Sequence, residues 1–379
     1  MKRPKIGFIS LSSPSDRRAS SGTCFRMAQA LSDIGEVVWI PLWPSRLVKF
    51  MELAYKGINL LLCKRALFLF TYLGSKLWAR CIDTERIDEC DLLFAFWGGS
   101  WLANADTMGK PVIYVSDATF ASMVGYYPPY SNLSARNVNQ GRDIERRSMS
   151  KASVVVLSSD WAAASAVNDM GISHDKVHVI EFGANIDDSD IARHEFSYQG
   201  HLHILFLGVE WKRKGGDIAV DAVRWLNENG VPATLHVVGI KELASSVAGL
   251  PYVDHIGFLN KNISSEYDKL VATINKCHCL LLPTIAECAG IAFCEASANG
   301  LPTFTHETGG VPNYIINGKN GYMLPLGSTG KDFGMKIKEC LSSGELERMS
   351  VDAPNVYRER LSWGVWERRM ADLIGHLFA

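Results

Sequence analysis

The chain has 379 residues, of which 47% are hydrophobic and 21% charged, and its formal net charge is −1 at pH 7. This composition is typical of a soluble globular protein, and the length predicts two domains with a cleft between them. The near-neutral charge lacks the basic excess of nucleic-acid-binding proteins, so we expect no nucleic-acid partner.

The sequence begins MKRPK and passes directly into a predicted strand, without the apolar segment of a secretion signal. Its nine cysteines are odd in number and lie mostly in apolar runs. We therefore expect a reduced, cytoplasmic protein. Cys277 and Cys279 form a C-x-C pair with no second pair of ligands nearby, so we expect core thiols rather than a metal site.

Short runs rich in β-branched and aromatic residues predict six buried parallel strands in the first half of the chain, at 5–12, 36–43, 90–98, 111–117, 152–159 and 176–183. Segments with helical spacing separate most of them, and two such segments close on glycine, at 22–35 and 160–171. This alternation predicts a doubly wound sheet.

A polar stretch at 185–200 suits a linker between domains, and the strand-helix alternation then restarts. Strands are predicted at 202–208, 233–239, 279–284 and 301–307. In the helix predicted between the first two, Ile218, Ala222 and Leu226 share one face, and Gly230 ends it. Open sheets of this kind bind ligands at the carboxyl ends of their strands, so the site is expected in the cleft between two such domains.

Two acids, Glu287 and Glu295, flank a small and mostly apolar stretch that follows the strand at 279–284. A helix is predicted to begin near Gly290, and its first N–H groups would form an anion site. A nucleotide sugar fits this pattern, because its sugar and ribose hydroxyls suit the carboxylates and its diphosphate suits the helix end. The structural alternative is that Glu287 is a helix-dipole charge and Glu295 a solvated residue.

The segment from 283 to 325, with two glutamates separated by seven intervening residues and followed by ASANGLPTFTHETGGVPNYIINGKNGYMLP, resembles the donor site of the family-4 glycosyltransferases (glycosyl transferases group 1). FLGVEWKRKGGDIAVDA at 206–222 and VVLSSDWAAASAV at 155–167 extend the resemblance. Members of this family are retaining enzymes with the GT-B fold, in which two Rossmann-like doubly wound domains face each other across a cleft. The resemblance implies this α/β fold here.

The resemblance also implies roles for individual residues. Glu287 would accept hydrogen bonds from the donor sugar and Glu295 from the ribose, while Lys214 would stabilise the leaving diphosphate. The phosphates would meet the backbone N–H groups of Gly290, Ile291 and Ala292.

The chain departs from the family pattern at Val209, where the family usually has arginine after the strand-ending glycine. Either Arg213 or Lys212 would supply the missing charge, and we favour Arg213 because its planar guanidinium can hold two phosphate oxygens. The alternative interpretation is that this basic cluster is only a solvated turn on the protein surface.

Three further contacts are expected with the substrates. The resemblance places Gly22, in the loop after the first strand, near the donor phosphates or the acceptor. Base recognition by backbone is expected near Gly257, Phe258 and Leu259. Asp117 ends a buried strand, and we expect it to touch the donor sugar or the acceptor hydroxyl, unless it only caps the next helix.

Residues 46–80 contain seven Lys or Arg and one acid among large apolar side chains, with no run suited to span a bilayer. Two interpretations stay open, an amphipathic surface that rests on anionic lipid, or core helices with a basic outer face. The first would add peripheral contact with the inner face of the membrane to a cytoplasmic location.

Together these observations predict a hexosyltransferase that moves a sugar from a nucleotide-sugar donor, with a UDP-sugar favoured, to an acceptor hydroxyl with retention. It would act without cofactor or metal, on a saccharide or lipid-linked acceptor in bacterial glycan, polysaccharide or glycolipid synthesis. We expect an acceptor domain at 1–195, a donor domain at 200–355, and a C-terminal helix at 356–379 that packs back on the first domain. A nucleotide-sugar epimerase and a non-catalytic nucleotide-sugar-binding subunit are the alternatives.

Overall fold

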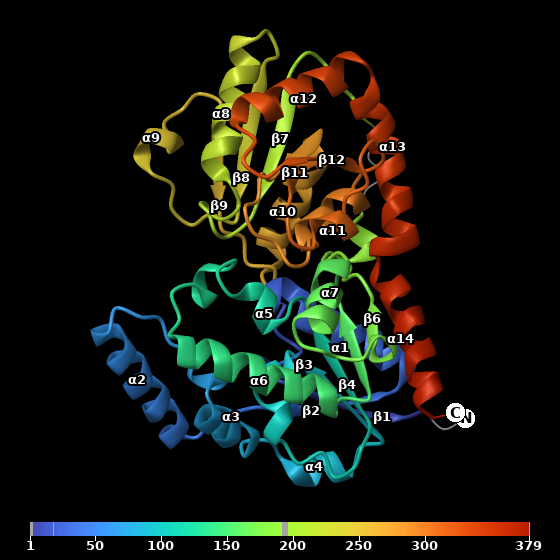
Figure 1. The fold of residues 1–379 in the computed structure, drawn as a ribbon. Helices are drawn as coiled ribbons and strands as arrows, with labels where there is room; N and C mark the ends of the chain where they lie inside the picture. Colours follow the sequence, from blue (N-terminus) through green and yellow to red (C-terminus); the bar gives the residue numbers. More distant parts are fainter. Residues whose placement is uncertain (1–2, 18, 192–195, 379) are drawn as a thin grey trace. The chain divides into compact units, whose positions relative to one another are not determined.

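A computed structural model describes residues 3–17, 19–191 and 196–378, and it divides the chain into two compact units (Figure 1). The first unit comprises Met1–Glu181 and Trp366–Ala379, and the second comprises Phe182–Val365. The division therefore falls earlier than the predicted linker, of which 192–195 lie outside the described residues.

The first unit is built on a six-stranded, all-parallel sheet with the order β2-β1-β3-β4-β5-β6. Its strands are β1 Lys5–Ser10, β2 Glu36–Pro41, β3 Leu92–Phe96, β4 Val112–Ser116, β5 Val154–Leu157 and β6 Val177–Val179. The inner strands β3, β4 and β5 are buried throughout, because helices cover both faces of a doubly wound sheet. The helices are α1 Thr23–Ile34, α2 Arg46–Leu61, α3 Tyr72–Ala79, α4 Thr84–Asp88, α5 Phe120–Met123, α6 Ala135–Lys151 and α7 Asp160–Asn168.

The second unit holds another six-stranded parallel sheet, with the order β12-β11-β10-β7-β8-β9. Its strands are β7 Leu202–Leu207, β8 Ala233–Val238, β9 Val253–Gly257, β10 Cys279–Leu281, β11 Thr303–Glu307 and β12 Gly321–Pro325. The helices are α8 Gly216–Glu228, α9 Ser245–Ala248, α10 Ser264–Lys276, α11 Ile291–Ala298, α12 Gly330–Ser342 and α13 Glu345–Val356. The predicted fold class, α/β with two doubly wound Rossmann-like units, is confirmed.

Local sequence explains where several helices begin and end. The predicted buried face of α8 is confirmed, since Ala222 and Leu226 are fully buried and Ile218 packs partly buried against the same core.

Helix α1 ends before Gly35, where a side chain could not be accommodated because its Cβ would lie 2.4 Å from the Pro4 carbonyl oxygen. Cys277 and Cys279 are fully buried in the core of the second unit, as expected of core thiols.

The structure differs from the prediction at the edges of the second sheet and in the C-terminal segment. Strands β9 and β12 were not predicted, because edge strands are mostly half-exposed and carry no continuous apolar run. The C-terminal segment is not one helix, since a π-helical turn ends at Leu361 and α14, Trp363–Leu377, begins after Ser362. The described part of α14 from Trp366 belongs to the first unit, where the fully buried Trp366 ring packs edge-on against Phe94.

A buried carboxyl group in the first unit makes its stability depend on pH. Glu145 of α6 is 3% exposed, accepts a hydrogen bond from the Tyr114 hydroxyl at 2.9 Å and accepts another from the Phe120 N–H. Burial raises the pKa of Glu145 from 4.5 to about 7, although both hydrogen bonds lower it. The folded state therefore binds a proton that the unfolded state has released between these two pH values.

We predict that Glu145→Gln removes this pH dependence. The contribution of Glu145 is fully present below pH 4.5 and is lost as the pH rises through about 7, which corresponds to a loss of about 3 kcal/mol. Glutamine keeps the shape of the protonated acid and does not ionise. Urea unfolding at pH 5, 6, 7 and 8 should show that the free energy of unfolding of the variant rises relative to that of the natural protein as the pH rises. A difference that stays constant with pH would contradict the assignment.

Candidate functional site

The fold points to one place in the second unit where a ligand site is expected. Strands β7 and β10 are neighbours in the sheet, and the chain continues from β7 to β8 on one side and from β10 to β11 on the other. This is the topological switch point, where open parallel sheets bind ligands beyond the carboxyl ends of their strands. The loop after β7 carries Lys214, and the loop after β10 carries Glu287.

Close backbone contacts hold these two loops against each other. Gly215 has a φ of +75°, and its Cα passes so close to Pro283 that a Cβ would lie 2.0 Å from the Pro283 carbonyl oxygen. Two residues before Gly215, the Arg213 carbonyl oxygen accepts hydrogen bonds from the Ile285 N–H at 2.9 Å and the Thr284 hydroxyl at 3.2 Å. The relative position of the two loops is thus set by backbone atoms.

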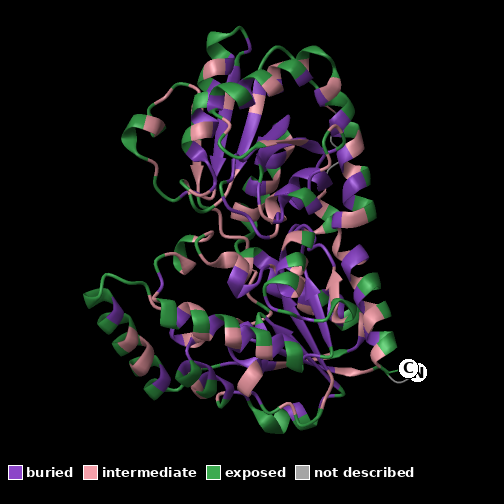
Figure 2. Ribbon diagram, in the orientation of Figure 1, coloured by how far each residue is buried: buried purple, intermediate pink, exposed green. Residues whose placement is uncertain are grey.

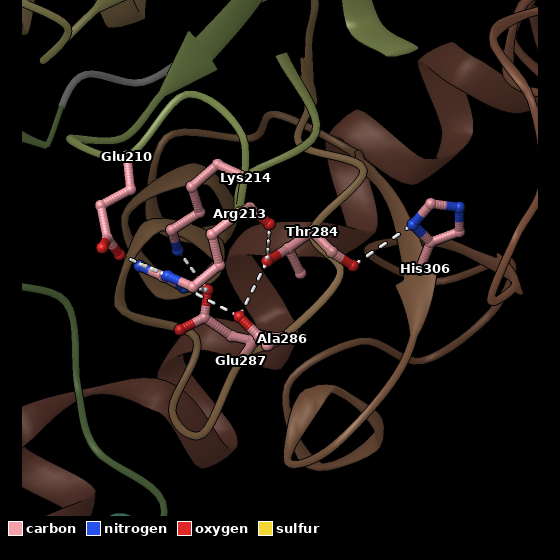
Figure 3. Close-up of polar contacts among 7 residues, drawn as sticks. All are labelled: Glu210, Arg213, Lys214, Thr284, Ala286, Glu287 and His306. Atoms are coloured by element: carbon pink, nitrogen blue, oxygen red, sulfur yellow. Dashed lines mark hydrogen bonds and ion pairs between the residues drawn. The ribbon is translucent and has the colours of Figure 1, made fainter. Parts of the chain in front are cut away.

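A buried ion pair joins the two loops (Figure 3). The Lys214 ammonium group binds the Glu287 carboxylate, and their side chains are only 11% and 8% exposed. The Arg213 guanidinium approaches the same carboxylate, with Nη1 3.7 Å from Oε2, and donates a hydrogen bond to the Ala286 carbonyl oxygen at 2.8 Å. Two cations therefore share one buried carboxylate, and they can turn to an anionic ligand only at the expense of these contacts.

Neighbouring polar groups hold this cluster in place (Figure 3). Glu210, whose side chain is 49% exposed, pairs with the Arg213 guanidinium from the solvent side. Fully buried His306 of β11 lies with Nδ1 3.2 Å from the Thr284 carbonyl oxygen and Nε2 3.1 Å from that of Ser328. Neither Glu210 nor His306 was singled out from the sequence, although both lie within the resembling segments.

The structure distinguishes Arg213 from Lys212. The Lys212 side chain is 83% exposed and pairs with Asp217 at 2.6 Å, as a residue of a solvated turn would. The Arg213 side chain is 10% exposed and lies beside Lys214 at the buried carboxylate. Val209, which stands where the family has arginine, is 63% exposed. The solvated-turn interpretation thus holds for Lys212 and fails for Arg213 and Lys214.

The predicted helix after Glu287 is present as α11, which begins at Ile291 with Gly290 as its N-cap. The Ile291 N–H donates to the Ala289 carbonyl oxygen at 3.1 Å, so a phosphate would have to share or replace this bond. Ala292 lies in the first turn, where helix geometry provides no intrahelical acceptor for the N–H.

Glu295 is not a solvated residue. It is 3% exposed and pairs with the Lys261 ammonium group at 2.6 Å, and Lys261 also donates to the Asn185 carbonyl oxygen at 3.3 Å. Both acids of the segment are therefore buried and each is held by a lysine from another loop. Lys261 was missed, because it lies 34 residues from Glu295 and no spacing rule links the two positions.

The loop after β9 presents the residues predicted to contact the base. Gly257 has a φ of +86°, with open space where a Cβ would stand, and its carbonyl oxygen accepts a hydrogen bond from the Gly239 N–H at 2.8 Å. The Phe258 ring is 40% exposed and has the Lys241 ammonium nitrogen 5.4 Å from its centroid, while Leu259 is half-buried.

Two predicted residues belong to the first unit. Gly22 is the N-cap of α1 with a φ of +97°, and it follows two serines that also have positive φ. Asp117 follows β4 and is half-buried, and its carbonyl oxygen accepts a hydrogen bond from the Ser158 hydroxyl at 3.3 Å. The capping alternative for Asp117 is wrong, because Thr119 is the N-cap of α5 and forms a capping box with Ser122.

Comparison with known proteins finds similarity to glycosyltransferases in the segment that holds this cluster. Residues 187–353 match the family described as glycosyl transferases group 1. This segment lies within the second unit and contains the whole cluster around Glu287. An uncharacterized glycosyltransferase of Methanocaldococcus jannaschii is 23% identical over 159 residues, which cover 42% of this chain and 44% of that protein.

A second relative and a solved structure of similar fold extend the comparison. Spore coat protein SA of Bacillus subtilis is 29% identical over 194 residues, covering 48% of this chain and 46% of that protein. This chain thus spans about half the length of the curated relatives it matches. The crystal structure of Anabaena HepE in complex with UDP-glucose has a TM-score of 0.64 at 15% identity, covering 98% of this chain and all of that chain. The fold is therefore of the GT-B type, and residues 187–353 carry the glycosyl transferases group 1 pattern.

We predict that Gly215→Ala disrupts the site, and that Gly230→Ala, at an equally left-handed position, does not. Gly230 has a φ of +79° with open space around its missing Cβ, so alanine there should cost only about 1 kcal/mol of left-handed strain. Alanine at Gly215 carries the same strain and also clashes with the Pro283 carbonyl oxygen, so we expect a loss of at least about 3 kcal/mol. Urea denaturation measures the free energy of unfolding of the two variants. Equal losses would show that the contact between Gly215 and Pro283 does not hold the two loops together.

Proposed function

We propose that this protein is a retaining glycosyltransferase that moves a sugar from a nucleoside diphosphate sugar to an acceptor hydroxyl. The observation that carries the proposal is the buried cluster of Arg213, Lys214 and Glu287 at the switch point of the second sheet. The match of 187–353 to the glycosyl transferases group 1 family supports it. UDP-sugars are the favoured donors, because the similarly folded HepE was crystallised with UDP-glucose.

The cations of the cluster would stabilise the leaving group. As the bond between sugar and diphosphate breaks, negative charge grows on the diphosphate. Lys214 and Arg213 lie in a largely water-excluded position, where a fixed positive charge stabilises that growth more than it would in water. N–H groups of Gly290, Ile291 and Ala292 at the start of α11 would add to this stabilisation. We therefore propose a reaction without a metal ion or cofactor.

The two acids would position the two sugars of the donor. Glu287 would accept hydrogen bonds from hydroxyls of the transferred sugar, and Glu295 from the ribose hydroxyls. Each of the two carboxylates is paired with a lysine, Glu287 with Lys214 and Glu295 with Lys261. Lys214 and Lys261 thus hold the carboxylates in place, and binding of the donor would exchange at least the first of these pairs. Base contacts would come from the backbone at 257–259.

The acceptor would be contacted by the first unit. We propose that Asp117, and the loop that ends at Gly22, meet the acceptor hydroxyl or the donor sugar. A phosphate oxygen of the leaving group would receive the acceptor proton, so no separate general base is needed. A saccharide or a lipid-linked acceptor in bacterial glycan, polysaccharide or glycolipid synthesis fits this proposal.

We predict donor turnover that depends on the buried cluster. The protein is incubated with UDP-, GDP- and ADP-sugars, and slow release of the nucleotide is followed. Lys214→Ala and Glu287→Ala should each lower release about 100-fold or more, by analogy with the removal of other charge-stabilising groups. Lys212→Ala is the matched control, because Lys212 is exposed and pairs only with Asp217 among the contacts described, and it should keep near-normal activity.

Three results of the same assay would contradict the proposal. A rearranged sugar nucleotide formed without any acceptor would identify an epimerase. Tight binding without turnover under a panel of acceptors would identify a binding subunit. Equal loss of activity in Lys212→Ala and Lys214→Ala would show that the burial of Lys214 is unrelated to catalysis.

A further inference from the structure

One face of α2 in the first unit is covered by the core of that unit. The helix begins after Ser45, whose hydroxyl accepts a hydrogen bond from the Val48 N–H at 3.3 Å. Val48 and Asn59 are 3% and 6% exposed, and Met51 and Tyr55 pack partly buried against the core. These four residues form a stripe at helical spacing, and the Tyr55 ring lies 5.7 Å from that of Phe68.

The opposite face of α2 is apolar and open to solvent. At 100° per residue, Phe50, Leu53, Leu60 and Leu61 project away from the buried stripe, and their exposed fractions are 68%, 70%, 74% and 86%. Figure 2 shows α2 at the edge of its unit, with exposed residues along its length. Isolated apolar residues on a surface are ordinary, but a continuous apolar strip marks a site of interaction.

The strip is bordered by positive charge. Arg46, Lys49 and Lys56 lie on α2 itself, and Lys64 and Arg65 follow its end. Glu52 is the one acid of the helix, and it pairs with Lys56 at 2.8 Å. On the helical wheel Lys49 and Lys56 stand along one edge of the apolar strip. Cationic side chains beside a solvent-facing apolar strip are typical of helices that lie in a lipid headgroup region.

We propose that α2 docks this protein on the surface of an anionic lipid bilayer. The helix would lie parallel to the membrane plane, with the strip of Phe50, Leu53, Leu60 and Leu61 entering the boundary between headgroups and acyl chains. Arg46, Lys49 and Lys56 would meet lipid phosphates. No helix among the residues that the structure describes is long and apolar enough to cross a membrane, so the contact would be with one leaflet.

The charge of α2 favours a membrane over a second copy of the chain. In a two-fold dimer the same surface meets itself, so the cations of one α2 would face those of its partner. An anionic bilayer instead provides negative charge and an apolar layer together. This inference does not depend on the proposed transfer reaction, because docking requires no nucleotide sugar.

The test is co-sedimentation of the full chain with vesicles of phosphatidylcholine alone or with 30% phosphatidylglycerol. We expect binding to the anionic vesicles that falls at least about tenfold on neutral vesicles or in 0.5 M salt. The triple variant Phe50→Gln, Leu53→Gln, Leu61→Gln should bind at least about tenfold more weakly. Lys49→Glu alone should weaken binding to anionic vesicles and leave the thermal melting temperature unchanged.

The matched control changes three exposed apolar residues of the second unit, Leu326→Gln, Met335→Gln and Val351→Gln, which are 57%, 49% and 68% exposed. It should bind vesicles as the natural chain does. Failure of the natural chain to bind anionic vesicles would overturn the proposal, as would equal binding by both triple variants. A dimer that dissociates in the α2 triple variant, without vesicle binding by the natural chain, would assign the strip to self-association instead.

Discussion

The candidate site depends on the close approach of two backbone segments, Gly215 and Pro283. Only a residue without a side chain allows this approach, and the Arg213 carbonyl then receives two hydrogen bonds from the facing loop. The approach brings Lys214 against Glu287 in a place where both are nearly excluded from water. Burying two charges costs several kcal/mol per ion, and their attraction only roughly offsets this cost. Such a pair contributes little net stability, and its position at the carboxyl edge of the sheet agrees with the proposal that it binds a ligand.

Two buried carboxylates occupy one short segment, and each is held by a lysine from another part of the chain. Glu287 pairs with Lys214, and Glu295 pairs with Lys261. The family match runs from 187 to 353, so it covers this arrangement and nearly all of the second unit. The first unit, which the match does not include, carries Asp117, the buried Glu145 and the exposed strip of α2. The family match thus bears on the second unit alone, and these features of the first unit rest on its own geometry.

The fold and the central residues of the candidate site could be predicted from the sequence, because both leave strong local patterns. Buried parallel strands read as continuous apolar runs, and β3, β4 and β5 were located within a few residues. The resembling motifs contained Lys214, Glu287 and Glu295. Edge strands β9 and β12 left no such run. Lys261 and Glu145 were not found because their importance comes from partners 34 and 31 residues away, and burial of a single charged residue leaves no periodic signal.

A crystal structure of the protein with bound UDP-glucose would test the central claim most directly. We expect the Lys214 ammonium group to leave Glu287 and bind a diphosphate oxygen, with the Glu287 carboxylate accepting from sugar hydroxyls and the start of α11 facing the phosphates. A nucleotide sugar bound at another place, with the Lys214–Glu287 ion pair intact, would contradict the account.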